Sequence, residues 1–269
     1  MLKYFNKPVL VAGGCSFTDP NFKSMYHPEM DVSFPKWPDL VGKELYYKVI
    51  NTGVSGAGNK LIANRVMDAI IANKNVKLVM VLWSGFDRFS IYTNRWCPFA
   101  VMHNICYKDL VKPKSEVTQL FYKKAVEEWF DLDENIRDNL RIIYSLQNFL
   151  EQRSIKYIFA QGVDPYMFDG MSQLYENGFL KNNLFDKRNR VKLLHIMDDP
   201  YFSLINDKHF YGWPGLEEVG GTNFTQWIRQ RENREDYHIS RVDKHPNALG
   251  HKDLSEKFIQ TYRDVYENN

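Results

Sequence analysis

The hydroxyl of Ser16 is the first side chain in this sequence that could do chemistry. It stands just past two glycines and a continuous apolar run, Val9 to Ala12, a pattern typical of a buried parallel strand that stops in a tight turn. Open α/β sheets keep their ligand crevice at the carboxyl ends of such strands. Ser16 could therefore be a nucleophile, or it could simply cap a turn or helix.

A second reactive pair, Asp243 and His245, stands near the other end of the chain. A serine hydroxyl is a poor nucleophile until a base takes its proton, and a neutral imidazole suits that task near pH 7. His245 could be this base, and Asp243 could accept the other ring N–H and fix the tautomer. The alternative is a solvated pair in a loop ahead of a helix cap.

Two further loops carry groups that could bind an oxyanion. The segment NTGVSGAGN supplies Gly53, Gly56 and Asn59, and the segment WSGFDR supplies Ser84 and Asp87. Gly56 precedes a predicted helix, where backbone N–H groups are free to point at a developing negative charge. The same glycine could also be needed only for the geometry of the turn.

The elements that must position these loops alternate between strand and helix. The apolar pattern predicts strands at 9–12, 48–51, 77–83 and 155–161, and helices at 37–46, from 59 and at 117–153. A last helix begins at Pro246 and Asn247. Such alternation predicts a doubly wound parallel sheet whose loops gather at one edge. Residues 84–114 look irregular.

The chain is expected to be one domain, residues 1–269. No internal repeat or convincing linker interrupts it, and residues 164–239 show only weak periodicity with several glycines. We interpret 164–239 as an insertion within the domain or a lid over the crevice.

Composition excludes several classes of partner. Lys and Arg total 35 and Asp and Glu total 33, so the net charge of +2 gives no reason to expect nucleic acid or an anionic membrane. No segment predicts a membrane span or a secretion signal. The three cysteines favour reduced thiols in a cytosolic protein.

Aromatic residues make up 15% of the chain and cluster at 86–107 and 201–227. They could pack beneath long loops or offer faces for sugar rings. The histidines show no compact ligand spacing, and neither a phosphate loop nor a dinucleotide motif is complete. We therefore expect no metal and no cofactor.

Taken in order, the blocks GGCSFT, NTGVSGAGN, WSGFDR and DKHPNALGH resemble the SGNH/GDSL hydrolase family. The blocks of that family are a GDS-like serine, a glycine, an asparagine and a late Asp/His pair, and the resemblance spans nearly the whole chain. GGCSFT and WSGFDR also look like sequences of bacteriophages and marine bacteria. The resemblance implies a three-layer α/β/α, flavodoxin-like sheet of about five strands, with insertions.

The resemblance also implies roles for individual residues. Ser16 would attack, His245 would carry the proton, Asp243 would orient His245, and the N–H groups of Ser16 and Gly56 would bind the oxyanion. The family's acid lies three residues before its histidine, which here is Val242, and Cys15 stands where the family usually has Asp. We expect Cys15 to be a small buried side chain rather than a competing nucleophile.

Asp87 stands where the family has its asparagine. Losing one oxyanion donor costs roughly 2.7–4 kcal/mol, and an ionised carboxylate about 4 Å from the oxyanion would add repulsion. Asp87 is therefore either protonated or paired with Arg88, in which case Asn59 or Ser84 could donate instead.

The function that the resemblance implies is that of a serine esterase acting through an acyl-serine intermediate. The expected substrate is a small acyl ester, such as an acetyl group on a carbohydrate, and the acyl group could pass to water or to another hydroxyl. The departures at Cys15, Asp87 and Val242 leave an alternative: a catalytically weakened SGNH-like protein that binds a glycan or is structural, in a virion if the chain is viral. The oligomeric state stays open.

Overall fold

The centre of the fold is a parallel sheet of five strands. The computed structural model describes residues 7–86, 88–92, 96–100, 132–163, 195–215, 217 and 220–268. The strands of the sheet are β1 (Val9–Gly14), β2 (Lys48–Asn51), β3 (Val76–Trp83), β6 (Lys156–Gln161) and β7 (Phe210–Tyr211). Their order is β2-β1-β3-β6-β7, and every neighbouring pair is parallel.

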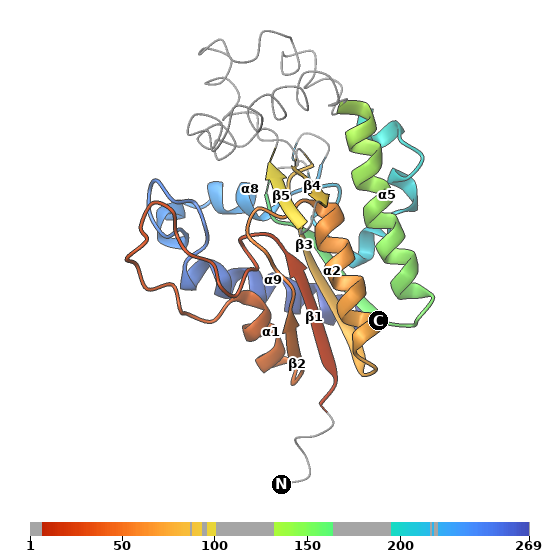
Figure 1. Ribbon diagram of the computed structural model, residues 1–269, viewed down its shortest axis with the longest axis horizontal. Coiled ribbons are helices and arrows are strands. Elements are labelled where there is room, and N and C mark those ends of the chain that lie inside the picture. The colour runs from red at the N-terminus through yellow and green to blue at the C-terminus, as the bar shows by residue number, and fades with distance from the viewer. Residues whose placement is uncertain are drawn as a thin grey trace.

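Helices cover both faces of this sheet (Figure 1). One face packs against α2 (Asn59–Ala72) and α5 (Leu132–Glu151). The other packs against α1 (Trp37–Glu44), α8 (Phe224–Arg229) and α9 (Ala248–Tyr266). The predicted three-layer, doubly wound α/β architecture is thereby confirmed.

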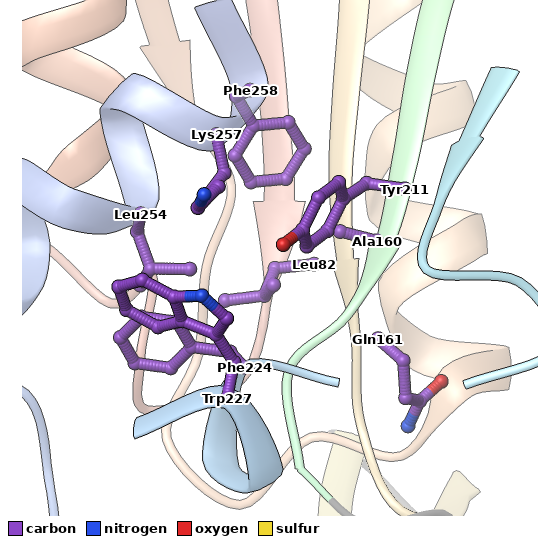
Figure 2. A pocket seen from close by; sticks show the side chains of 9 residues that line it. All are labelled: Leu82, Ala160, Gln161, Tyr211, Phe224, Trp227, Leu254, Lys257 and Phe258. Carbon is purple, nitrogen blue, oxygen red and sulfur yellow. The ribbon is translucent and has the colours of Figure 1, made fainter. Parts of the chain in front are cut away.

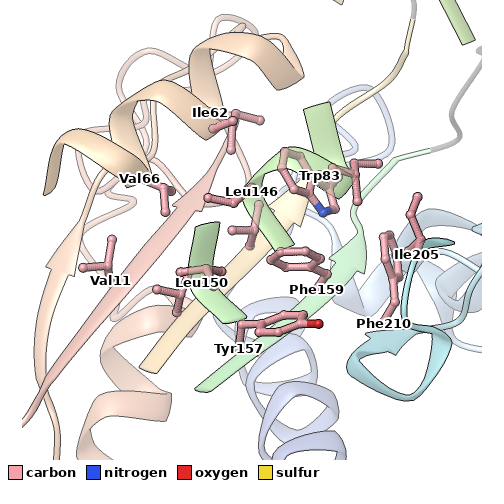
Figure 3. Packing of buried hydrophobic residues seen from close by; sticks show 14 of the residues in the cluster. Val11, Ile62, Val66, Trp83, Leu146, Leu150, Tyr157, Phe159, Ile205 and Phe210 are labelled. Atoms are coloured by element: carbon pink, nitrogen blue, oxygen red, sulfur yellow. The ribbon is translucent and has the colours of Figure 1, made fainter. Parts of the chain in front are cut away.

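Successive side chains of β1 pack alternately against the helices on the two faces of the sheet. Val9 and Val11 belong to the apolar cluster beneath α2 and α5, whereas Leu10 and Ala12 belong to the cluster beneath α1 and α9. All four are buried. Figure 3 shows the first cluster, in which α2 and α5 close over the strands. Because β1 is covered on both sides, it is continuously apolar.

The apolar cluster beneath α1 and α9 fixes α9 on the sheet. This helix begins three residues after His245. The rings of Trp37 in α1 and Phe258 in α9 stack with centroids 4.3 Å apart. At the start of α9, the side chain of Asn247 accepts hydrogen bonds from the N–H groups of Leu249 and Gly250. This cap satisfies donors that the first helical turn leaves free, and it fixes the point at which the chain leaves His245.

Most predicted elements occur close to their expected bounds, but residues 84–114 are not uniformly irregular. Within them, β4 (Arg88–Tyr92) and β5 (Trp96–Ala100) form an antiparallel pair. The apolar alternation of this hairpin is interrupted by Pro98, which the ribbon accommodates because, among the described residues, each of its strands pairs on one side only. The predicted helical residues 117–131 lie outside the described residues.

The described half of the 164–239 segment is joined to the main sheet. Residues 210 and 211 form β7, which pairs with Phe159 and Ala160 of β6. The described part of the segment also contains 3-10 turns at His195–Asp198, Phe202–Leu204, Asp207–His209 and Arg234–Tyr237. Residues 164–194 lie outside the described part.

The topology identifies the edge at which a ligand crevice is expected. From β1 the chain crosses through α1 to β2, and from β2 it crosses back through α2, on the opposite face, to β3. The loops after β1 and β3 therefore diverge, which creates the crevice of a doubly wound sheet. Among the described residues, no helix is both long and apolar enough to cross a membrane.

Candidate active site

The turn after β1 exposes Ser16 at the crevice. The carbonyl of Cys15 accepts the N–H groups of Thr18, at 2.9 Å, and Asp19, at 3.0 Å. This tight turn lifts Ser16 out of the sheet, where it is partly exposed, while Cys15 is fully buried. Within the described chain, no acceptor takes the N–H of Ser16.

The loop after β2 is fastened directly to this turn. The Asn51 side chain donates to the carbonyl of Thr18 at 2.7 Å, and a Cβ on Gly53 would lie 2.7 Å from the Thr18 carbonyl carbon. Only glycine allows so close an approach of two backbones. The second loop therefore has a fixed position beside Ser16.

Asp19 completes this attachment. Its Oδ2 accepts from both the N–H of Ser55, at 2.9 Å, and the Ser55 hydroxyl, at 2.7 Å. The next residue, Gly56, has a φ of +79°, a conformation that other residues adopt only with strain. No acceptor among the described residues takes its N–H, so Gly56 presents a free donor in the loop that is fastened to the Ser16 turn.

Ser16, His245 and Asp243 come together at this edge of the sheet. The Nε2 atom of His245 lies 2.9 Å from Ser16 Oγ, and its Nδ1 atom lies 2.6 Å from Asp243 Oδ1. A carboxylate can only accept, so Nδ1 carries the proton and Nε2 of the neutral ring is free to accept the Ser16 proton. About a quarter of the His245 side chain is exposed.

Asp243 is held as an anion. Its burial alone would raise the pKa of the carboxyl group, but hydrogen bonds from the His245 ring, from Ser24 and from the His245 backbone lower the pKa to about 2. Asp243 is only 1% exposed. The carboxylate thus keeps its negative charge beside the imidazole throughout the neutral range.

A local turn brings Asp243 to the His245 ring across a spacing of only two residues. Asp243 Oδ1 accepts the backbone N–H of His245 at 3.0 Å as well as the ring N–H, which is the geometry of an Asx turn. Val242, at the family's usual position for the acid, is 61% exposed. The turn explains how the nearer Asp243 reaches the ring.

Two phenylalanine rings enclose the imidazole. The Phe22 ring lies 4.3 Å from the His245 ring between centroids, and the Phe17 ring lies 5.4 Å away at a steep angle. Phe17 directly follows Ser16, whereas Phe22 belongs to the loop between β1 and α1. These contacts restrict the orientation of the ring beyond what the hydrogen bonds alone impose.

Asn59 serves the framework of the site. Its Oδ1 accepts the N–H of Ser84 at 2.8 Å, and its Nδ2 donates to the Ser84 carbonyl and to Asn139 Oδ1. Both amide hydrogens are therefore used, and Asn59 is 1% exposed. This arrangement contradicts the expectation that Asn59 could donate to an oxyanion.

Replacing Asn59 with Ala should mainly reduce stability. The change removes three buried hydrogen bonds and takes away the acceptor of the Ser84 N–H and the Asn59 donor to Asn139 Oδ1, which we expect to cost about 2–4 kcal/mol of unfolding free energy. Denaturant unfolding measures this loss. A stable variant with a strongly reduced catalytic rate would instead indicate an oxyanion donor.

The remaining predicted donors lie in the loop after β3. Ser84 is fully buried, and its hydroxyl has no hydrogen-bond partner among the described residues. Asp87 lies outside the described residues. Arg88, at the start of β4, is 8% exposed, and its Nε and Nη1 atoms have no partner in the described part of the chain.

A small apolar pocket adjoins the site. Figure 2 shows it between β3, β6 and β7 and the helices α8 and α9, with Phe224 and Trp227 on one side and Phe258 on another. The Phe224 ring also contacts Phe17, at 6.1 Å between centroids, so Phe17 lies between His245 and one of the residues that line the pocket. Lys257 lies 5.0 Å from the Trp227 ring.

Sequence reasoning missed the supports of the reactive groups. Phe22 and Ser24 lie in a loop whose polar sequence carries no periodic signal, and Asn139 is one of several polar residues in a long helix. Phe22 follows Ser16 by only six residues, and this closeness in sequence is the signal that could have placed Phe22 near the site.

Some aromatic residues of the segment 201–227 pack against one another, since Trp213 contacts Phe202 and Phe210.

The chain resembles known proteins in its structure but not detectably in its sequence. No protein-family model matches the chain, and no curated protein matches it. Several solved structures resemble it. They include the psychrotrophic esterase EstA from Pseudoalteromonas sp. (10% identity, 97% of this chain and 100% of that chain, TM-score 0.45). Another is LAE5, an alpha/beta hydrolase enzyme from the metagenome of Lake Arreo (13% identity, 94% of both chains, TM-score 0.46). A third is AlinE4, an SGNH-hydrolase family esterase (13% identity, 97% of both chains, TM-score 0.39).

Proposed function

We propose that this protein is an SGNH/GDSL-type serine hydrolase that cleaves carboxylic esters. The observation that carries the proposal is the continuous chain of contacts from Ser16 Oγ through the His245 ring to Asp243, at 2.9 and 2.6 Å. Nucleophile, base and orienting acid are thus within hydrogen-bond reach of one another, as acyl transfer through serine requires.

In the first half of the reaction, Ser16 Oγ attacks the ester carbonyl carbon while His245 Nε2 takes the hydroxyl proton. The carbonyl oxygen becomes an oxyanion in the tetrahedral intermediate. As the intermediate collapses, the bond to the alcohol oxygen breaks and the imidazolium gives its proton to that oxygen. Asp243 stabilises the imidazolium in between, and the acyl group stays on Ser16.

In the second half, water takes the place of the alcohol. His245 accepts a proton from the water as its oxygen attacks the acyl-serine carbonyl, then returns the proton to Ser16 Oγ as the acid leaves. A hydroxyl of a second molecule could take the place of water, in which case the acyl group is transferred rather than hydrolysed.

The oxyanion donors in this proposal are the N–H groups of Ser16 and Gly56. Two features support them: neither N–H has an acceptor in the described chain, and Asp19 and Gly53 fasten their two loops together. Preorganised donors of this kind supply a large share of catalysis because they need no rearrangement during the reaction.

We also propose that the ester carries a small acyl group, such as acetyl, on a carbohydrate. Partly exposed rings of Trp227 and Tyr211 line the pocket beside the site. Such rings can stack against the apolar face of a sugar. The partner of the protein is then a small-molecule or glycan ester.

A fluorophosphonate probe tests the proposal. Such probes modify a serine only when a neighbouring base activates it, so wild-type protein should be labelled stoichiometrically at Ser16. The Ser16→Ala variant should not be labelled, while Ser33→Ala, which removes an exposed hydroxyl elsewhere, should label normally. A folded wild type that the probe leaves unmodified contradicts the hydrolase.

The second candidate is a catalytically weakened glycan-binding protein of the same architecture. The commitment of both Asn59 amide hydrogens to the framework favours it, because Asn59 then cannot replace the asparagine donor of the family. Unlabelled, folded protein that binds acetylated oligosaccharides would support this candidate.

A further inference from the structure

The carboxylate of Asp243 has a second partner on the side away from His245. The hydroxyl of Ser24 lies 2.5 Å from Asp243 Oδ2. Both residues are buried, Ser24 at 3% exposure and Asp243 at 1%. Ser24 belongs to the loop between β1 and α1, so this contact joins the beginning of the chain to the turn before α9.

The direction of this hydrogen bond is fixed by its surroundings. Ser24 Oγ accepts the backbone N–H of His27 at 2.9 Å, and the ionised carboxylate of Asp243 has no proton to give. The single hydroxyl proton of Ser24 must therefore point to Oδ2. Since a hydrogen bond to an ionised group is stronger than one between neutral groups, this contact is one of the firmer ones at the site.

A second connection holds the same two segments together. His27 Nε2 lies 2.8 Å from Ser240 Oγ, and Ser240 Oγ accepts the backbone N–H of Asp243 at 3.0 Å. The segment 24–27 therefore contacts the turn 240–243 at two points. Ser24 binds the carboxylate of Asp243, and His27 binds Ser240, whose hydroxyl oxygen accepts the backbone N–H of Asp243.

The orientation of the carboxylate matters because its terminal torsion is soft. An aspartate can turn its oxygens about the last bond at little cost, yet Oδ1 must face His245 Nδ1 for the ring to keep its tautomer. Both hydrogen bonds from His245 go to Oδ1. A donor at Oδ2 fixes the plane of the group.

We propose that Ser24 is a positioning residue of this site: its hydroxyl holds the Asp243 carboxylate in the plane in which Oδ1 faces His245, and so keeps Nε2 free to accept the proton of Ser16. The inference rests on the proposed function. It adds a fourth residue, from a loop without sequence signal, to the three that do the chemistry.

Kinetics of three variants test this role. Ser24→Ala removes the donor, Ser24→Cys replaces it with a weaker donor of similar size, and Ser33→Ala is a control in the same loop, where the hydroxyl is exposed. We expect kcat on a small acetyl ester to fall about 10- to 100-fold in Ser24→Ala and less in Ser24→Cys. KM should be unchanged in both, since Ser24 does not touch substrate. The control should match the wild type.

A second measurement does not depend on turnover. In a Ser16→Ala background, carboxyl-carbon NMR should follow the titration of Asp243, whose pKa the hydrogen bonds from His245 and from Ser24 both lower. Adding Ser24→Ala should move that titration upwards, and adding Ser33→Ala should not.

The two measurements separate the inference from the function it rests on. If the wild type hydrolyses no ester but the titration moves, the hydrolase proposal fails and the Ser24–Asp243 contact stands. Wild-type kcat in both Ser24 variants, or an Asp243 titration that Ser24→Ala leaves in place, overturns the positioning role. Should Ser24→Ala not fold, Ser24→Cys carries both measurements.

Discussion

Replacing His245 with Ala should lower kcat for ester hydrolysis by about 10⁵–10⁶-fold. Nε2 lies 2.9 Å from the Ser16 hydroxyl, and in the described part of the chain no other basic side chain contacts that hydroxyl. Without a base, Ser16 keeps its proton and remains a poor nucleophile. Steady-state hydrolysis of an activated acetyl ester measures the loss, with Ser16→Ala as the floor.

The fold should survive this substitution. The backbone of His245 stays anchored, because its carbonyl accepts the N–H of Ile239 and its N–H donates to Asp243. Only the ring is lost, and it is partly exposed, so unfolding free energy should fall by about 1 kcal/mol. Added imidazole should enter the space between Phe17 and Phe22 and restore part of the rate. Turnover near the wild-type level would refute His245 as the base.

Replacing Asp243 with Ala should lower kcat on the order of 10⁴-fold. The variant loses both the charge that stabilises the imidazolium and the acceptor, 2.6 Å from Nδ1, that fixes the tautomer. KM should change little, since Asp243 is buried and cannot touch substrate. The same hydrolysis assay measures the effect, and a loss below tenfold would show that another group orients His245.

Asp243→Asn should be milder than Asp243→Ala, for a reason specific to this site. Its amide oxygen can take the place of Oδ1 and keep both bonds to His245, provided that the amide nitrogen faces Ser24. The Ser24 hydroxyl can turn to accept from that nitrogen. The tautomer would then be preserved and only the charge lost. Equal losses in the two variants would indicate that Ser24 does not turn.

Asp243 should also make stability depend on pH. Its pKa of about 2 lies below the ordinary value of 3.8, so the folded state favours the charged form. The resulting stabilisation, about 2 kcal/mol, is nearly complete above about pH 5 and is lost as pH falls through about 2. The stability difference between wild type and Asp243→Ala should therefore narrow over that interval in denaturant unfolding at stepped pH.

The position of Ser16 could be inferred from the sequence because it follows a strand with a strong signal, and those of Asp243 and His245 because they precede a helix with a clear apolar stripe. The run before Ser16 marks a buried strand, and a doubly wound sheet brings strand ends together. The supports could not be inferred in this way. Ser24 meets Asp243 across 219 positions, and no local pattern marks a single hydroxyl in a polar loop. Asn59 shows the opposite error, since a polar residue at the right place proved to be part of the framework.

The elements of the fold likewise differ in whether the sequence predicts them. The strands at 48–51 and 155–161 and the stripe of α9 were predictable from periodicity alone. β7 has two residues, too few for any alternation to be seen, and only its pairing with β6 reveals it. The hairpin of β4 and β5 was obscured by Pro98, because a proline argues against a central strand but not against an open ribbon.

Ser16 and His245 are separated by 229 positions, and the helix that follows His245 docks on the far face of the sheet. A half-assembled chain can thus possess the serine, its turn and the neighbouring amide donors and still be inert. In the proposed mechanism the serine gains its base only where α9 and the turn before it have docked on the sheet, so a reagent that captures an activated serine would report on that docking.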